Sequence, residues 1–279
     1  MVSATLQHIP GRDSLLELPR MLADPIGFLR ERHQAFGDVW RTRWIVPIVV
    51  AVGPAANQTI LVTGRDHFSY RGGYGEQGVD DGGHRRAPAA ALLGRLRHHR
   101  RQRRLGAAHV GRASRVAGAP AREALRVLGD RDLAVTDQDA LVETGWFLKE
   151  IERRCPVVLF FPRRVVDDVE VAGFKVPRGT SAMYSPFLTH MGSGFDDPDT
   201  FDPARFSPAR GERQARLPNL IGFGGGPRIC LGKAFALLQL RVMITTLLRK
   251  HRIERVDGGT VLALPTHRPR GSTVRFIAR

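Results

Sequence analysis

Cysteine is scarce in this chain: its 279 residues include two, Cys155 and Cys230. Two cysteines provide neither a disulfide framework nor paired zinc ligands, and such a content is usual in a reducing cytoplasm. No signal peptide is evident, and the apolar run 45–52 contains Pro47 and is too short to span a bilayer. The sequence therefore predicts a cytoplasmic protein without a membrane span.

Aromatic residues are missing from a long central stretch, with none between Tyr74 and Trp146. Residues 80–132 consist largely of Arg, Ala, Gly, Leu and His, which offer little apolar surface to offset the entropy of ordering. Between His84 and Arg131 there are thirteen Arg and two acidic residues, a local excess of eleven within the net charge of +16. The remaining charge of about +5 is an ordinary surface balance, so the basic character belongs to one segment.

This atypical segment is open to three interpretations. It could bind nucleic acid or an anionic membrane through its basic patch. It could be a solvated, disordered insert with weak helices at best. It could also arise from translation in the wrong frame across GC-rich DNA, and the 39 Arg against 4 Lys in the chain indicate a GC-rich source. The encoding DNA would distinguish the third interpretation from the other two.

A glycine-rich loop, residues 223–232, has the spacing Phe-x-x-Gly-x-Arg-x-Cys-x-Gly and precedes a long apolar stretch. Glycines let backbone N–H groups approach a sulfur atom, and a helix N-terminus favours an anionic thiolate. A cysteine in that position can ligate haem iron from the proximal side. An isolated cysteine would be better explained as a buried structural residue, but the complete pattern favours a ligand. The fixed positions are Phe223, Gly226, Arg228, Cys230 and Gly232.

The loop resembles the haem-binding loop of the cytochrome P450 family, in its bacterial type. The resemblance implies a mainly α fold with a small β region, and haem b held by the Cys230 thiolate. Arg228 is then suited to a haem propionate, and Phe223 can screen the sulfur from water. The implied reaction inserts one atom of O₂ into a small apolar organic substrate, with electrons from a ferredoxin or a flavoprotein reductase. A nucleic-acid partner is not expected.

Four further arginine and glutamate positions follow the same family order. Glu150 and Arg153 lie at i and i+3 on one face of a predicted helix, and Arg205 follows in the motif Phe-Asp-Pro-Ala-Arg-Phe. The resemblance implies that these three side chains form a buried network behind the haem. It also implies that Arg163 binds a propionate, with Arg164 as the neighbouring candidate.

The predicted elements divide the chain into three parts. Residues 1–79 form an N-terminal helix and hairpin part, residues 80–132 are the atypical segment, and residues 133–279 form the haem-binding part. In the first part, Asp24-Pro25 starts a helix that Gly37 ends. The other expected helices cover 55–62, 136–154 and 231–250, the last one buried all round. The expected strands cover 39–43, 45–52, 157–161, 169–174 and 180–184, with a closing strand pair in 260–278.

The resemblance covers residues 9–79 and 133–279, and it fails between them. The family has a long run of helices there, including the oxygen-binding helix with its Ala/Gly-Gly-x-Asp/Glu-Thr motif. Residues 140–144 resemble that motif without its glycine and lie too close to Glu150 to be it. The sequence thus predicts that the central helical region is missing or out of frame. Two alternatives follow: a catalytically impaired remnant of such an enzyme, or a basic nucleic-acid-binding protein.

Overall fold

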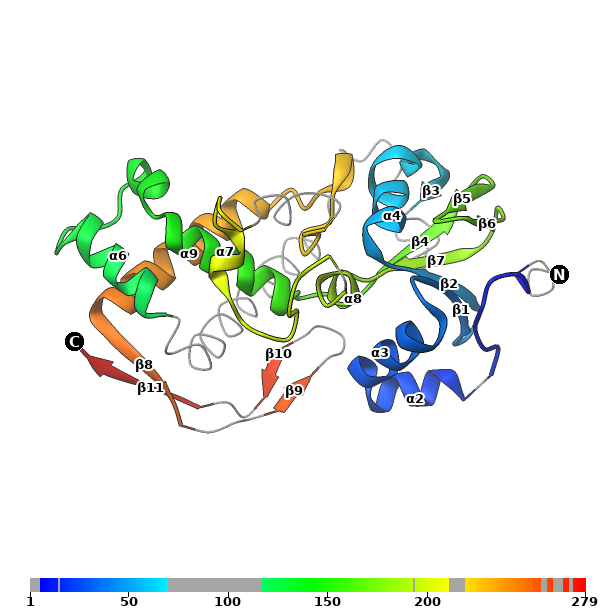
Figure 1. Cartoon of the computed structure of the whole chain (residues 1–279), viewed down its shortest axis with the longest axis horizontal. Helices are drawn as coiled ribbons and strands as arrows, with labels where there is room; N and C mark the ends of the chain where they lie inside the picture. The colour runs from blue at the N-terminus through cyan, green and yellow to red at the C-terminus, as the bar shows by residue number, and fades with distance from the viewer. Residues whose placement is uncertain are drawn as a thin grey trace, which may run out of the picture.

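The structure is a computed structural model that describes residues 6–14, 16–69, 117–192, 194–210, 219–256, 260–262, 268–270 and 273–279. Residues 80–116 of the Arg-rich segment lie outside this set. The described part has a β-rich region around one five-stranded sheet and a helical region built on α6, α7 and α9, at opposite ends of the long axis (Figure 1).

Two helices open the β-rich region: α2 (Glu17–Ala23) and α3 (Pro25–Phe36). The Asp24 side chain accepts a hydrogen bond from the Gly27 N–H at 3.0 Å, and Pro25 occupies the first turn, where its missing N–H costs nothing. Gly37, with φ +80°, follows the last turn. The start and the end predicted for this helix are both confirmed.

The five-stranded sheet joins distant parts of the chain. Its order is β1-β2-β7-β4-β3, and β2 pairs with β7 in parallel. β1 and β2 form the predicted antiparallel hairpin. The predicted strand 157–161 is wrong in position, because the strand begins where that prediction ends. The bounds are β1 (Val39–Arg43), β2 (Pro47–Ala51), β3 (Phe68–Ser69), β4 (Phe161–Val165) and β7 (Ser181–Tyr184).

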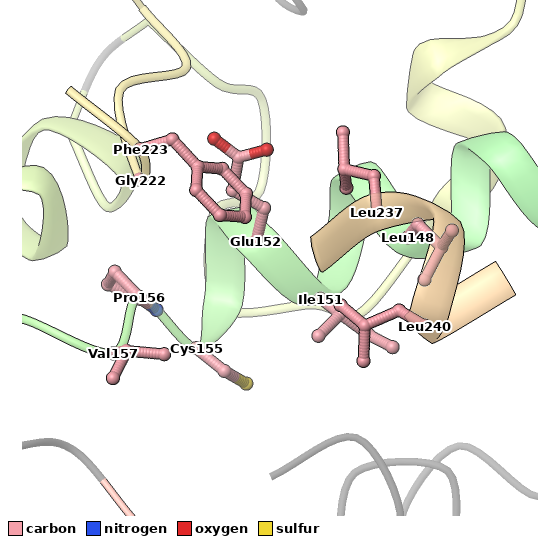
Figure 2. A pocket seen from close by; sticks show the side chains of 10 residues that line it. All are labelled: Leu148, Ile151, Glu152, Cys155, Pro156, Val157, Gly222, Phe223, Leu237 and Leu240. Atoms are coloured by element: carbon pink, nitrogen blue, oxygen red, sulfur yellow. The ribbon is translucent and has the colours of Figure 1, made fainter. Parts of the chain in front are cut away.

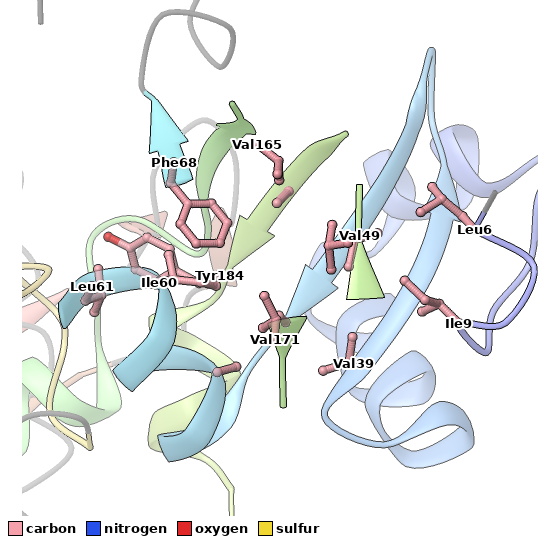
Figure 3. Close-up of a cluster of buried hydrophobic side chains, with 14 of the residues drawn as sticks. Leu6, Ile9, Val39, Val49, Ile60, Leu61, Phe68, Val165, Val171 and Tyr184 are labelled. Atoms are coloured by element: carbon pink, nitrogen blue, oxygen red, sulfur yellow. The ribbon is translucent and has the colours of Figure 1, made fainter. Parts of the chain in front are cut away.

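One face of this sheet carries the main apolar cluster of the β-rich region (Figure 3). Leu6 and Ile9 cover one end of it, while Phe68 and Tyr184 lie at the end near η1, a π-helical turn (Thr59–Thr63) that continues α4 (Gly53–Gln58). Burial of these side chains on both strands and helices fixes the register of the sheet. The smaller elements here are η2 (Arg65–His67), β5 (Val169–Val171) and β6 (Phe174–Val176).

The helical region packs α6 (Gly118–Leu128) and α7 (Val142–Arg154) against α9 (Lys233–Lys250). Its buried cluster is formed mainly by Ala121, Phe147, Ile151, Leu240, Ile244 and Leu248. The Glu123 carboxylate of α6 caps α7, because it accepts the N–H groups of Glu143 and Thr144 at 2.8 Å each. The sequence analysis placed residues 117–132 in the atypical segment, whereas the structure shows a packed helix in that place.

Two further expectations differ from the structure. α9 is not buried all round, because Phe235 and Val242 are exposed while Leu240 and Ile244 face the core. The closing strands form two pairs rather than one: β9 (Thr260–Leu262) with β10 (Arg268–Arg270), and β11 (Val274–Ala278) with β8 (His251–Arg255). The remaining elements are η3 (Val135–Ala140), α8 (Pro186–His190), η4 (Pro203–Phe206) and η6 (Gly226–Arg228).

Candidate functional site

The cysteine loop, residues 223–232, ends at the start of α9. The Cys230 N–H donates to the Phe223 carbonyl at 2.8 Å, which closes the loop on itself. The Cys230 carbonyl accepts the Lys233 N–H at 3.0 Å, so the cysteine sits immediately before the first turn of the helix. The Cys230 side chain is exposed, whereas Cys155 is buried, and neither forms a disulfide. The loop thus presents one accessible sulfur atom.

Gly226 allows this loop to lie against the β-rich region. Its φ is +61°, and a Cβ atom there would lie 1.9 Å from the backbone oxygen of Leu61 in η1. No side chain fits such an approach, so glycine is required for both space and conformation. Gly232 differs: a Cβ atom at this position would be 3.9 Å from the Cys230 Sγ, an ordinary contact.

The two predicted propionate-binding arginines both lie near the loop. Nη1 of Arg228 donates a hydrogen bond to the Phe68 carbonyl at the end of the sheet. Arg163 on β4 is 2 % exposed, whereas its neighbour Arg164 is exposed to solvent. Of the two candidates on this strand, Arg163 is therefore the one that faces the interior.

Tyr184 connects Arg163 to the cysteine loop. Nη2 of Arg163 donates to the Tyr184 hydroxyl at 3.2 Å, and the guanidinium carbon lies 5.0 Å from the centre of the tyrosine ring. The same hydroxyl is 3.5 Å from the position that a Cβ atom on Gly224 would take. The strands β4 and β7 thus bring Arg163 close to the loop through an aromatic side chain that the sequence analysis did not single out.

Glu150 and Arg153 of α7 form a fully buried ion pair. Both side chains are 0 % exposed, and two parallel hydrogen bonds of 2.7 Å join the guanidinium to the carboxylate. Nη1 of Arg153 also donates to the carbonyl oxygens of His190 and Pro198 at 2.9 and 2.8 Å. Such a bidentate geometry with additional acceptors is what makes a buried pair tolerable.

Arg205 completes this cluster from η4. Its Nε lies 3.4 Å from Oε2 of Glu150, and its Nη1 donates to the Asp196 carbonyl at 2.6 Å. The Asp202 N–H donates to Oε1 of Glu150 at 2.9 Å. The three side chains that the sequence analysis grouped therefore lie together, and they hold the irregular segment 196–205 against α7.

His190 is a residue to which the sequence analysis gave no role. It is fully buried at the end of α8, with Nδ1 3.0 Å from the Arg153 carbonyl. Its Nε2 accepts the Ile221 N–H at 2.9 Å, so Nδ1 carries the proton and donates to that carbonyl. Burial lowers the pKa of His190 to about 3 and keeps the ring neutral. The imidazole therefore ties the end of α7 to the chain just before the loop.

Glu152 is a second residue that was missed. It lies on the buried face of α7, between Leu148 and Cys155 in helical spacing, and it lines a pocket beside Gly222 and Phe223 (Figure 2). A carboxylate within an apolar helical stripe is the sequence signal that could have revealed it. The pocket is otherwise apolar, with side chains from α7, α9 and the turn after α7: Leu148, Ile151, Cys155, Pro156, Val157, Leu237 and Leu240.

The donor set of this site fits a haem better than a bare metal ion. Within the described ranges no three His, Cys, Asp or Glu side chains gather around one point. A haem needs one axial protein ligand, because the porphyrin nitrogens supply the equatorial ones, and Cys230 offers an exposed sulfur at a helix start. The guanidinium groups of Arg163 on β4 and of Arg228 within the loop suit the carboxylates of the porphyrin edge.

Residues 116–268 match the family model described as Cytochrome P450, which is more than half of the chain. The chain belongs to the cytochrome P450 family, whose members carry haem iron on a cysteine thiolate. The match begins ahead of α6, so it includes residues 117–132 that the sequence analysis had left outside the resemblance.

Curated relatives and solved structures agree with this assignment. The chain is 33% identical over 138 residues to "Probable cytochrome P450 4aa1" of Drosophila melanogaster and 35% identical over 126 residues to "Cytochrome P450 4V2" of Rattus norvegicus. These alignments cover 48% and 44% of the chain but 26% and 24% of the relatives, so the chain matches about a quarter of their length. A bacterial relative, "Putative cytochrome P450 136" of Mycobacterium tuberculosis, is 31% identical over 143 residues, 51% of the chain and 28% of that protein.

The fold is similar to that of a retinoic acid-bound cyanobacterial structure, CYP120A1, with a TM-score of 0.79 and 16% identity over 94% of this chain and 96% of that one. A zebra fish cytochrome P450 structure with progesterone gives a TM-score of 0.59 and 21% identity over 68% of this chain and 44% of that one. The predicted fold class, mainly α with a small β region and a partial cytochrome P450-like fold, is confirmed. Among the helices of the described residues, none has the length and apolar character needed to cross a bilayer.

Proposed function

We propose that this chain is a haem-thiolate monooxygenase that inserts one oxygen atom of O₂ into an organic substrate. The observation that carries the proposal is the Cys230 sulfur: it is exposed at the start of α9, on a loop closed by the bond between Cys230 and Phe223. The bound haem supplies the activation of O₂, and a thiolate ligand favours O–O cleavage. The family assignment supports the same reaction class.

Each residue of the loop then has a separate role. Cys230 would hold the haem iron through its thiolate, and Phe223 would shield that sulfur from water, which would affect the potential of the iron. Gly226 gives the loop its close contact with η1. Arg228 and Arg163 bind the propionates of haem b.

Glu150, Arg153 and Arg205 act at a distance from the chemistry. They hold the segment 196–205 and the end of α7 in place by a buried bidentate pair and its carbonyl acceptors. His190 hydrogen-bonds both to the Arg153 carbonyl at the end of α7 and to the Ile221 N–H, two residues before the cysteine loop. We therefore infer that this network positions the loop rather than taking part in oxidation.

The partners follow from the reaction class. Electrons come from a ferredoxin or a flavoprotein reductase, and Lys233 beside the loop suits an acidic donor surface. The substrate is a small apolar organic molecule. The protein acts in the cytoplasm, in keeping with two cysteines that form no disulfide.

Turnover and haem content together test the proposal. The full chain is reconstituted with haem, supplied with a ferredoxin and its reductase, and assayed for O₂ consumption coupled to oxidation of an apolar substrate. The Cys230→Ala variant should lose oxidation, whereas the Cys155→Ala variant, a matched change at a buried thiol, should retain it. Haem uptake without turnover in the wild type would instead support an impaired remnant of the enzyme. Failure to take up haem, with binding to nucleic acid, would support the basic nucleic-acid-binding alternative.

A further inference from the structure

Three consecutive backbone amides lead into the cysteine loop, and buried side chains face them from two elements. The Ile221 N–H donates to His190 of α8 at 2.9 Å. Gly222 packs against Glu152 of α7, since a Cβ atom on it would lie 2.5 Å from Cγ and 3.0 Å from Oε1 of that side chain. The amides of Gly222 and Phe223 favour the charged form of the carboxyl group. The chain is therefore held from both sides immediately before the loop begins.

Glu152 is unusual because its carboxyl group is buried and, among the residues that the structure describes, forms no ion pair with an arginine. The side chain is 9 % exposed, and Oε1 has no partner at full hydrogen-bond geometry among the described residues. Figure 2 shows the carboxyl group beside the Phe223 ring, within a pocket whose other side chains are apolar. Placing a carboxylate there costs free energy that a leucine would not cost. A buried titratable group that destabilises the fold is a candidate for a functional role.

A short path of backbone bonds connects Glu152 to the cysteine. Phe223 lines the same pocket as Glu152, and its carbonyl accepts the Cys230 N–H at 2.8 Å. A shift of Phe223 is therefore transmitted to Cys230. Gly222 fits this arrangement, since a Cβ atom on it would lie 2.5 Å from Cγ of Glu152.

We propose that Glu152 is a positioning residue for the cysteine loop, holding Gly222 and Phe223 so that Cys230 presents its sulfur in the geometry that haem requires. This inference rests on the proposed function, because it assigns a purpose to the position of Cys230. Glu152 acts through the backbone and touches neither the sulfur nor a substrate.

Ionisation adds a pH dependence to this role. Burial raises the pKa of Glu152 to about 7, against the opposing effects of Lys233, of the two amides and of Lys149. Lys233 of α9 also lies near Phe223, with its Nζ 5.6 Å from the ring centre. Because the folded site favours the neutral acid, ionisation should weaken the contact of Glu152 with Gly222 and Phe223, so the loop should be held less firmly above pH 7 than below it.

The test compares three variants of the full chain: Glu152→Leu, Glu152→Gln and, as a matched control, Glu170→Gln at an exposed position of β5. Amide exchange in the haem-free protein should become about tenfold faster at Gly222 and Phe223 in the Leu variant, which corresponds to about 1.4 kcal/mol. Haemin affinity should fall by a similar factor. The Gln variant keeps an oxygen acceptor, so its exchange rates and haemin affinity should lie between those of the Leu variant and the wild type. These values should not change with pH through ionisation at position 152. The control should match the wild type.

Thermal stability separates positioning from simple support of the fold. The Glu152→Leu variant should melt at a higher temperature than the wild type while it binds haemin more weakly. Because the folded-state pKa of Glu152 lies above its unfolded value, the folded protein binds more protons between pH 4.5 and pH 7, and wild-type stability falls as the pH rises through that window. The gain in melting temperature should therefore be larger at pH 8 than at pH 5.

Gly222→Ala offers an independent check, since its new Cβ atom displaces the Glu152 side chain. The single variant should reproduce the faster exchange of the Leu variant, and adding Glu152→Ala should change it little further. Unchanged amide exchange and haemin affinity in the Glu152→Leu variant would overturn the inference. A wild type that takes up no haem would overturn the proposed function instead, and the exchange measurement would still decide the role of Glu152.

Discussion

At the scale of single residues, two side chains of opposite charge are buried together in α7. Glu150 and Arg153 are enclosed without solvent contact, and each depends on the other for compensation of its charge. Removing one partner leaves an uncompensated charge in the interior, which is costlier than losing the pair as a whole. The same reasoning does not apply to exposed pairs, which contribute little.

The Arg153→Ala variant should therefore lose about 3–5 kcal/mol of unfolding free energy. Urea denaturation followed by circular dichroism measures this loss. The control is Arg252→Ala, whose pair with Glu254 lies on the surface, with 62% and 40% of the two side chains exposed. A loss at Arg153 no larger than at Arg252 would contradict the assignment of a buried structural pair.

His190 should make stability depend on acidity. Burial lowers the pKa of His190 to about 3 in the folded protein, so between pH 3 and pH 6.5 the unfolded chain binds the additional proton. Stability from this residue is full above pH 6.5 and falls as the pH decreases through that window. The His190→Asn variant should show a flatter dependence of unfolding free energy on pH from 6.5 to 4, measured by denaturation at each pH. An equal slope in variant and wild type would show that the imidazole titrates normally.

At the scale of elements, the cysteine loop shows what a local pattern can predict and what it cannot. The spacing in residues 223–232 identified the loop and the helix that follows it, because glycine, arginine and cysteine positions are local chemistry. It could not reveal that Gly226 touches Leu61 of η1, since that contact joins segments far apart in the sequence. The capping of α7 by Glu123 could not be predicted either, because Glu123 lies on another helix, α6.

Two effects of a side chain at position 226 can be distinguished: the collision of its Cβ atom with η1 and the strain of a positive φ. Gly226→Ala should destabilise the loop more than Gly173→Ala does, although both glycines have positive φ, +61° and +86°. The strain of that conformation costs about 1–2 kcal/mol in either case. A Cβ atom on Gly173 meets nothing within 4 Å, whereas one on Gly226 collides with backbone. Unfolding free energies and haemin affinities of both variants provide the measurement, and equal effects would contradict the contact with η1.

At the scale of the whole molecule, the parallel pairing of β2 with β7 makes the described N-terminal and C-terminal parts one sheet. The family match confirmed the predicted class of fold. The division into two folded parts around a basic segment, which the composition predicted, stays a prediction. The composition did not predict the pairing of β2 with β7, because tertiary packing rather than local sequence decides which strands pair in a sheet. The predicted absence of the central helical region stays a prediction, as do the three interpretations of the Arg-rich residues 80–116.

Haem binding should stabilise the whole molecule, because a ligand that binds the folded state alone raises stability with its concentration. At a haemin concentration of 100 times the Kd, the expected gain is about 2.7 kcal/mol. Differential scanning calorimetry of the full chain with and without haemin should show a higher Tm for the wild type and a smaller shift for Cys230→Ala. An identical shift in both would indicate binding that does not involve the cysteine.

The absorption spectrum of the haem-reconstituted chain, reduced and exposed to CO, shows whether the Cys230 thiolate is the ligand of the iron. The account predicts a strongly red-shifted Soret band in the wild type and in Cys155→Ala, and its loss in Cys230→Ala. A wild-type band without that shift, or a shifted band that persists in Cys230→Ala, would contradict a Cys230 thiolate on the iron.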